Sequence, residues 1–230
     1  MIERVTIPFG TIAKILTGHS PVKREFFMTA DLFNLGAEEA SPDSAGERIF
    51  QAARELFYRQ GIRAIGVDAI AAAAGTTKMS LYRNFGSKDQ LVAAVLEEQD
   101  RLFWEWWDES IAPYPGEPRR QIERLFREFE TAASDDDSCR GCPIANASVE
   151  IIDENHPARL IVVRHHEEIL KRLRALAAEM GARDPDQLGD ALMLLMGGSF
   201  LSRLCFADLG PVKSVSEIAR QLIDAHTAPA

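Results

Sequence analysis

The chain is 230 residues long, with 26 Lys and Arg against 35 Asp and Glu, so its formal net charge is −9. Such acidity argues against a protein that coats nucleic acid or anionic membranes without specificity. Hydrophobic residues make up 46% and charged residues 27% of the sequence, which are ordinary values for a globular protein. The sequence contains no apolar run of the roughly 20 residues that a membrane-spanning helix needs. Without a secretion-type N-terminus or a disulfide framework, we expect a soluble cytoplasmic protein.

The first 43 residues differ from the rest of the chain. They alternate weakly between apolar and polar residues, match neither a helix nor a strand, and end in an acidic, turn-prone stretch at 37–43. We interpret residues 1–43 as a flexible extension, or as a mis-assigned start with the true initiator at Met28.

Helix start and stop signals follow from residue 44 onward. Ser44 and Glu47 have the spacing of a capping box, and Gly61 ends a helix of about four turns. A second capping box at Ser87 and Gln90 begins another long helix. Further helices are predicted at 117–133, 143–152, 157–180, 185–206 and 213–225. Because no strand-like alternation appears after residue 43, the sequence predicts an all-α fold.

Two short helices are predicted between the long ones, one from Val67 to Ala74 and one centred on Leu81. A pair of this kind, joined by a glycine turn, is the arrangement that offers a helix to the DNA major groove. With Leu81 as the buried centre of a helical wheel, Phe85 and Thr77 lie close to it. The outward side chains are then Met79, Ser80, Tyr82 and Arg83, with Lys78 and Asn84 at the flanks. This mixture of donors, a cation and an aromatic suits base edges and phosphates better than a merely solvated face.

At these residues the sequence resembles the tetracycline-repressor (TetR) family of bacterial transcription regulators. The resemblance covers about 60 residues from Ser44 to Trp104, and its specific part is GVDAIA at 66–71 with AGTTKMSLYRNFGSKDQL at 74–91. Some positions depart from the common pattern. Ile65 and Gly66 stand where hydroxyl residues usually begin the second helix, and Asn84 stands where His or Tyr is usual. These departures concern the operator sequence rather than DNA binding itself.

The resemblance implies a domain division and a set of contacts. Residues 44–104 would form a helix-turn-helix DNA-binding domain, with the motif at about 67–86, joined by a connecting helix to a ligand-binding and dimerisation bundle at 105–230. The side chains implied at double-stranded operator DNA are Thr77, Lys78, Met79, Ser80, Tyr82, Arg83, Asn84 and Lys88. Among them Lys88 would clamp a phosphate at a helix N-terminus, where the free amides favour the same anion.

The charge distribution agrees with a DNA-binding segment independently of the family. Residues 44–88 contain seven Lys and Arg against three Asp and Glu, a net charge of +4. Residues 1–43 carry −2, and residues 89–230 carry −11. The acidity therefore lies outside the proposed DNA-binding segment.

The C-terminal two-thirds offers weaker signals for a dimer and a ligand. The predicted homodimer seam joins Leu188, Ala191, Leu192, Leu195, Met196, Gly197, Gly198, Ser199 and Ser202 to Val215, Ile218, Ala219, Leu222 and Ile223, with ordinary core packing as the alternative. A pocket for an apolar or aromatic small-molecule effector is predicted among Phe103, Trp104, Trp106, Trp107, Met193, Met196 and Phe200, with core packing again the alternative.

Other chemistry has little support in the sequence. Cys139 and Cys142 form a lone CxxC, which we interpret as ordinary thiols, with a thiol switch as the alternative. His156, His165 and His166 are expected on a solvated helix face rather than around a metal ion. No catalytic or cofactor-binding signature is present, so we expect neither an enzyme nor a cofactor or metal site.

The leading hypothesis is a homodimeric, ligand-responsive transcription regulator of the TetR type, with a repressor favoured over an activator. The alternative is a small-molecule-binding or thiol-sensing helical protein without a DNA role. Specific, salt-sensitive binding to operator DNA separates the two.

Overall fold

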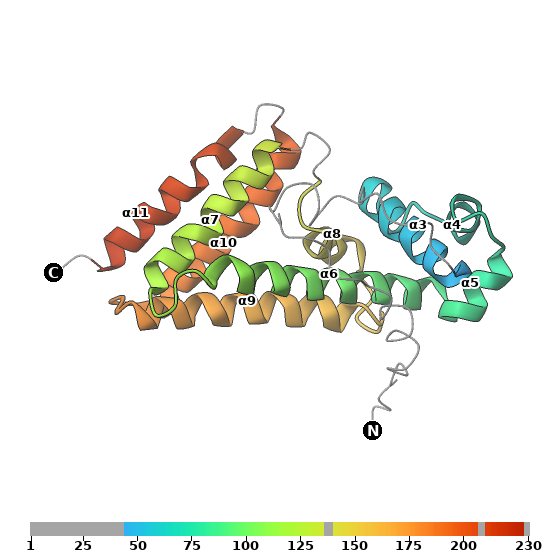
Figure 1. Ribbon diagram of the computed structural model, residues 1–230, viewed down its shortest axis with the longest axis horizontal. Helices are drawn as coiled ribbons and strands as arrows, with labels where there is room; N and C mark the ends of the chain where they lie inside the picture. Colours follow the sequence, from blue (N-terminus) through green and yellow to red (C-terminus); the bar gives the residue numbers. More distant parts are fainter. Residues whose placement is uncertain (1–43, 136–139, 207–209, 228–230) are drawn as a thin grey trace, which may run out of the picture.

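The computed structural model describes residues 44–135, 140–206 and 210–227, and within these ranges it contains helices and no strand (Figure 1). The α-helices are α3 (Ala45–Gln60), α4 (Val67–Ala73), α5 (Lys78–Phe85), α6 (Lys88–Ile111), α7 (Pro118–Asp135), α8 (Pro143–Glu150), α9 (Arg159–Glu179), α10 (Pro185–Cys205) and α11 (Val215–Thr227). The all-α prediction is confirmed. The extension predicted at 1–43 lies outside the described residues.

The predicted helix starts are also found. The Ser44 side chain accepts a hydrogen bond from the Glu47 amide, and the Ser87 side chain accepts one from the Gln90 amide. The C-terminal boundaries differ slightly from those expected. The eighth helix already ends at Glu150, and a 3-10 turn, η1 (Gly210–Ser214), precedes α11.

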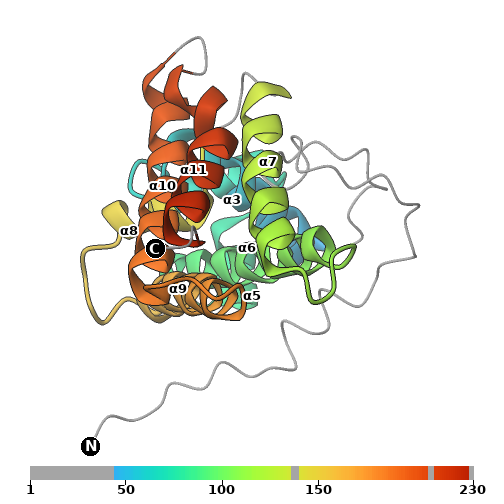
Figure 2. The same ribbon diagram turned by 90° about the vertical axis from the view of Figure 1, so that its left-hand side faces the viewer.

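The long helix α6 is the spine of the molecule (Figure 1). Helices α3, α4 and α5, called the head below, surround its N-terminal end. Helix α9 runs beside the rest of α6 in the same direction, as the ion pairs from Glu97 to Arg164 and from Asp108 to Arg172 show. Helices α7, α10 and α11 stand against this pair at the end away from the head (Figure 2). We call α7 to α11 the body.

One continuous cluster of buried apolar side chains joins head and body. Ile49 of α3 and Leu81 of α5 are completely buried in the head, as is Leu91 at the start of α6. Since α6 supplies core residues along most of its length, a shift of this helix in the body changes the position of the head.

Within the described ranges, none of the helices is both long enough and apolar enough to span a bilayer.

Candidate nucleic-acid interface

The head holds α5 on a rigid scaffold. Leu81 anchors the buried side of α5, and the Arg48 Nε atom donates a hydrogen bond to the Ala74 carbonyl at 3.1 Å, tying α3 to the turn after α4. Gly75 in that turn has φ +57°, a left-handed conformation that favours glycine. The result is a helix-turn-helix with α5 in the position of the recognition helix.

The exposed side of α5 is the one that the helical wheel predicts. Met79 is 75% exposed, which is unusual for a large apolar side chain, and Tyr82 and Arg83 are exposed beside it. Ser80 is half-buried. The Thr77 hydroxyl accepts a hydrogen bond from the Ser80 amide and so caps the N-terminus of α5. This surface combines a cation, a phenol and an apolar side chain, a set suited to the edges of bases.

Lys78, at the first position of α5, is held by a neighbouring acid. Its ammonium lies 2.7 Å from the Asp68 carboxylate on α4, and both side chains are more than half exposed. An exposed pair of this kind contributes little to stability. It does keep the charge of Lys78 close to a carboxylate that would repel phosphate.

Lys88, predicted to clamp a phosphate, makes a contact inside the chain. Its Nζ atom donates to the Ile62 carbonyl at 2.6 Å and lies 6.0 Å from the centroid of the Phe57 ring. The side chain is half-buried at the start of α6, so it also fixes the head on that helix.

Asn84 is turned toward α3 rather than outward. Its Nδ2 atom donates to the Ser80 carbonyl one turn earlier at 2.6 Å. On the other side, its Oδ1 atom would lie 2.9 Å from a Cβ placed on the buried Gly46. The amide is thus occupied within the head, unlike the side chains of Met79, Tyr82 and Arg83.

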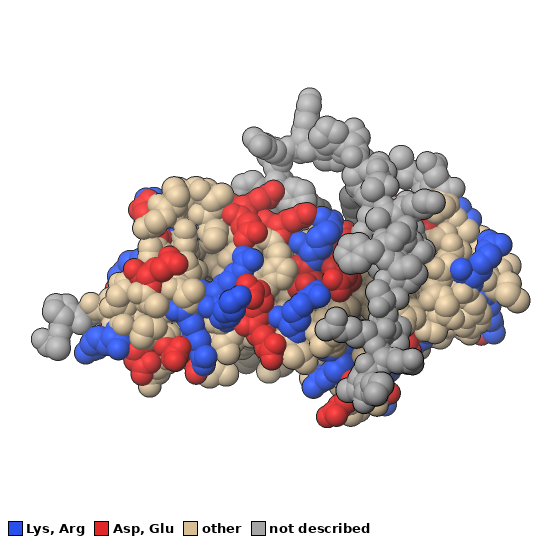
Figure 3. All heavy atoms as spheres, turned by 90° about the horizontal axis from the view of Figure 1, so that it is seen from below, with Lys and Arg blue, Asp and Glu red and all other residues tan. Residues whose placement is uncertain are grey.

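Charges are distributed unevenly over the surface seen in Figure 3. Acidic and basic side chains alternate over the body. Many of them pair with each other, as Arg174 of α9 does with Asp190 of α10. The end that carries the head shows mainly basic and uncharged atoms. This agrees with the net charge of +4 for residues 44–88.

The aromatic side chains predicted to line an effector pocket pack against one another. The Phe103 ring lies 5.1 Å from Trp104 and 6.0 Å from Trp107, and Phe129 links Trp106 to Phe200. Phe103, Trp107 and Met196 are buried, while Trp104, Met193 and Phe200 are half-buried. These ring contacts are those that the alternative of core packing expects, and the effector pocket among these side chains stays a prediction.

A buried polar network beside this cluster was missed from the sequence. Asp100 of α6 accepts hydrogen bonds from Trp104 Nε1 at 2.9 Å and from Arg164 at 2.8 Å, and its Oδ1 atom lies 2.8 Å from Nδ1 of His165. The prediction that His165 lies on a solvated face is wrong, because its side chain is only 1% exposed. The network fastens α6 to α9.

Burial and hydrogen bonding set the charges in this network. Burial would raise the pKa of Asp100, but hydrogen bonds from His165 and Arg164 outweigh it and hold the pKa below its ordinary 3.8. For His165, burial lowers the pKa below its ordinary 6.5 despite the opposing effect of Asp100. A neutral imidazole therefore faces an ionised carboxylate at neutral pH.

We expect this neutral histidine to make the protein less stable in mild acid. Below pH 6.5 the unfolded chain protonates His165 while the folded chain resists protonation, so the free energy of unfolding falls as the pH falls. His165→Asn should remove this contribution, which is at most about 1.4 kcal/mol per pH unit. Urea unfolding between pH 7.5 and pH 5, roughly the range in which histidines titrate, gives the free energy of unfolding against pH. We expect a smaller slope for His165→Asn than for the native chain. Parallel curves would contradict the assignment.

The head touches the body through the segment around α8. The Glu150 carboxylate at the end of α8 accepts a hydrogen bond from the Arg63 amide at 2.9 Å, just after α3. Before α8, the Arg140 amide donates to the Tyr58 hydroxyl at 2.7 Å, and its guanidinium donates to the Arg59 carbonyl at 2.8 Å. These contacts all reach the C-terminal end of α3 or the loop after it, so the position of α8 affects the tilt of the head.

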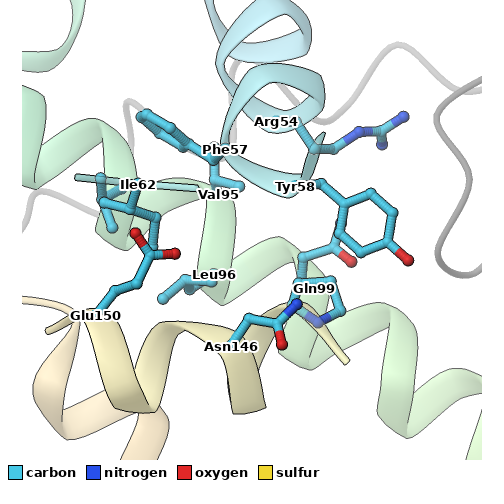
Figure 4. Close-up of a pocket in the computed structure, with 11 residues that line it drawn as sticks. Arg54, Phe57, Tyr58, Ile62, Val95, Leu96, Gln99, Asn146 and Glu150 are labelled. Carbon is cyan, nitrogen blue, oxygen red and sulfur yellow. The ribbon is translucent and has the colours of Figure 1, made fainter. Parts of the chain in front are cut away.

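A cavity of about 20 Å³ lies where α3, α6 and α8 meet (Figure 4). A more open groove of about 270 Å³ lies beside it, and Ile62 and Glu150 line both. We call the first the junction cavity and the second the junction groove. Neither was predicted, because their walls come from segments far apart in the sequence.

Helices α10 and α11 carry an exposed apolar surface. Leu194 is 77% and Leu201 is 62% exposed, and Gly197 and Gly198 lie exposed between them on the same face of α10. Ile218 of α11 is exposed too. Of the residues predicted for the seam, Gly197, Gly198 and Ile218 lie on this exposed surface. Others are buried within the chain: Leu188, Leu192, Met196, Val215, Ala219 and Ile223. For these side chains the alternative of ordinary core packing is correct.

The CxxC motif is only partly described. Cys142 is buried at the start of α8, and Cys139 lies outside the described residues. Among the described residues, no group of three or more His, Cys, Asp or Glu side chains is placed to hold a metal ion.

Comparison with known proteins finds bacterial transcriptional regulators that are similar to this chain. The family model described as "Bacterial regulatory proteins, tetR family" matches residues 49–95. Transcriptional regulator AcuR of Cereibacter sphaeroides is 25% identical over 175 residues, which are 72% of this chain and 80% of AcuR.

Two solved structures cover most of the chain. SCO4454, a TetR-family transcriptional regulator of Streptomyces coelicolor, is 27% identical with a TM-score of 0.74 over 80% of this chain and 96% of that one. The putative TetR transcriptional regulator sav143 of Streptomyces avermitilis is 32% identical, with a TM-score of 0.69 over 80% of this chain and 98% of its own. On this fold, this helix-turn-helix and these relatives, the chain belongs to the TetR family of DNA-binding transcriptional regulators.

Proposed function

We propose that the protein is a homodimeric repressor that a small-molecule effector releases from its operator. One observation carries the DNA-binding part most directly: α5 presents Met79, Tyr82 and Arg83 to solvent at the end of the molecule where basic residues predominate. We assign residues 44–104 to DNA binding and 105–230 to ligand binding and dimerisation. Like the relatives named as regulators, the protein would act by binding rather than by catalysis.

The exposed face of α10 supports the homodimer. Leu194, Gly197, Gly198 and Leu201 recur at helical spacing, and the two glycines allow another helix to approach closely. Apolar side chains exposed to this degree in a row are typical of an interface. Dimerisation also meets a geometric need, because two recognition helices must reach major grooves about 34 Å apart.

The DNA contacts divide by chemistry. We propose that Met79, Ser80, Tyr82 and Arg83 face bases, and that Thr77, Lys78 and Lys88 lie at the backbone of the DNA, with Lys88 exchanging its contact with the Ile62 carbonyl for a phosphate. For Asn84 we consider a positioning role as well as a DNA contact, since its amide already donates to the Ser80 carbonyl inside the head.

Substituting Arg83 and Lys88 tests this division. Arg83→Ala should cost about 1–3 kcal/mol on the preferred operator and relax the preference at one base pair. Lys88→Ala should weaken binding to all sequences alike and reduce the slope of log affinity against log salt by about 1. Fluorescence anisotropy on matched and mismatched duplexes measures both effects. Equal losses on every duplex for both variants would contradict the division.

Asn84 and Gly46 form a matched pair for a second test. A Cβ at position 46 has only Asn84 atoms as its three nearest contacts, the closest at 2.9 Å. If Asn84 sets the tilt of α5, Gly46→Ala should weaken operator binding severalfold in the native background and have little effect in Asn84→Ala. If Asn84 instead reads a base directly, the two substitutions should act additively. A double-mutant cycle on operator affinity decides between these outcomes.

The alternative function is ligand or thiol sensing without a DNA role. The buried Cys142 next to the α3 contacts is the observation that favours it. Under this alternative, Arg83→Ala and Lys88→Ala would leave ligand binding and thiol reactivity unchanged.

A further inference from the structure

The junction cavity is lined by one amide side chain of α6, that of Gln99. Gln99 of α6 is only 8% exposed, and its side-chain amide makes no hydrogen bond within the part of the chain described. Figure 4 places this amide at the cavity near Asn146 and Tyr58. An amide on the wall of a mainly apolar cavity is the kind of group that orients a ligand through a hydrogen bond.

The remaining walls are mainly apolar. Phe57 of α3 and Val95 and Leu96 of α6 line the cavity, with Ile62 and Glu150 at the side of the junction groove. In the present arrangement the cavity of about 20 Å³ has room for one or two water molecules. A larger ligand needs the wall of Ile62 and Glu150 to move, which would join the cavity to the groove of about 270 Å³.

We propose that the junction cavity and junction groove form the effector site, and that its ligand is a compact, uncharged, largely apolar molecule with one hydroxyl or carbonyl group for the Gln99 amide. The inference deepens the proposed function, on which its regulatory part rests. It locates the effector between head and body instead of within the aromatic cluster of α6 and α10, whose rings pack against one another.

At this position a bound ligand acts directly on a contact that holds the head against the body. Displacing Glu150 breaks its 2.9 Å hydrogen bond with the Arg63 amide, which joins the end of α8 to the loop after α3. A ligand too large for the closed cavity therefore binds preferentially to a conformation in which the head is released from α8. By linkage, that ligand lowers the affinity for an operator that requires the closed arrangement.

Phenol and toluene are a matched pair of probes, since both carry one benzene ring and only phenol has a hydroxyl. With the ¹⁵N-labelled full-length protein, we expect phenol to shift the Gln99 side-chain amide resonances, identified by their loss in Gln99→Leu, and toluene to shift them less. Gln99→Leu should abolish the preference for phenol over toluene, as measured on backbone resonances of α6. Gln60→Leu, a change at an exposed glutamine of α3, should leave it intact.

A second experiment fills the junction cavity with a side chain. Val95→Phe places a ring in the ligand's space, so phenol should no longer bind, while circular dichroism confirms that the helices remain. On a selected operator, phenol at saturation should lower the affinity of the native chain by about tenfold and leave that of Val95→Phe unchanged.

The outcomes separate the two proposals. No phenol-induced shift at Gln99, or an undiminished phenol response in Val95→Phe, would overturn the site. Phenol binding at Gln99 with unchanged operator affinity would overturn its role as the effector site. A chain that selects no operator would refute the proposed function, whereas the resonance measurements would still decide whether the site exists.

Discussion

Replacing Leu201 with glutamate is expected to convert the protein into a monomer that no longer binds its operator with useful affinity. Leu201 is 62% exposed on the glycine-containing face of α10, where we propose that the second copy packs. A carboxylate buried there would have no partner and would strongly oppose association. Losing the second recognition helix should reduce operator affinity by about 100-fold or more. Analytical ultracentrifugation and fluorescence anisotropy measure the two effects.

Leu160→Glu is the matched control for this experiment. Leu160 is 77% exposed at the start of α9, outside the proposed seam, so the same substitution there should leave both mass and affinity unchanged. If Leu201→Glu stays dimeric and binds DNA normally, the seam does not include this face of α10. If both variants become monomeric, the seam extends beyond α10 and α11.

Removing the carboxylate of Asp100 is expected to have the largest effect on stability. Asp100→Ala leaves the Trp104 indole, the His165 imidazole and part of the Arg164 guanidinium without their shared acceptor. The side chains of Asp100 and His165 are 8% and 1% exposed, so water does not readily replace that acceptor at the imidazole. We expect a loss of about 3 kcal/mol in the free energy of unfolding. Urea unfolding at neutral pH measures the loss.

Asp108→Ala provides the comparison. Asp108 also joins α6 to α9, through a 2.7 Å ion pair with Arg172, but its side chain is 64% exposed. Its removal should cost less than about 1 kcal/mol, because exposed ion pairs contribute little. Equal losses for the two variants would mean that burial of the Asp100 network contributes nothing to stability.

The head could be predicted from the sequence because its signals are local. Ser44, Gly75 and Ser87 mark helix ends through contacts within a few residues, and the buried Leu81 fixes the orientation of α5. The outward direction of Met79 and Tyr82 follows from helical geometry alone. Asn84 escaped this reasoning, since its inward turn depends on a glycine in α3, 38 positions earlier in the sequence.

In the body, the sequence predicts helices well but not what each face contacts. The apolar residues of α10 occur on all sides, so periodicity could not decide that Leu192 faces the core and Leu194 faces solvent. His165 was misplaced for a related reason: its partner Asp100 lies 65 residues earlier, and only the packing of α6 on α9 brings them together. The junction cavity lies between three helices that are far apart in the sequence, so no local sequence pattern predicts it.

The net charge of −9 is compatible with DNA binding because most acidic residues lie outside residues 44–88, which carry +4. Mixed charges cover much of the body surface in Figure 3, and an acidic body should repel DNA that approaches it. Binding then depends on docking through the basic end, which favours specific over nonspecific complexes.

Selection of bound sequences from a pool of random duplex DNA by the full-length protein tests whether the chain is a dimeric regulator that reads DNA through α5. We expect enrichment of an inverted repeat whose half-sites lie about one helical turn, or a multiple of it, apart. We also expect Arg83→Ala to enrich a repeat altered at one symmetric position in each half-site. Failure to enrich any sequence, or enrichment of a single half-site unaffected by Arg83→Ala, would contradict a dimeric regulator that reads DNA through α5.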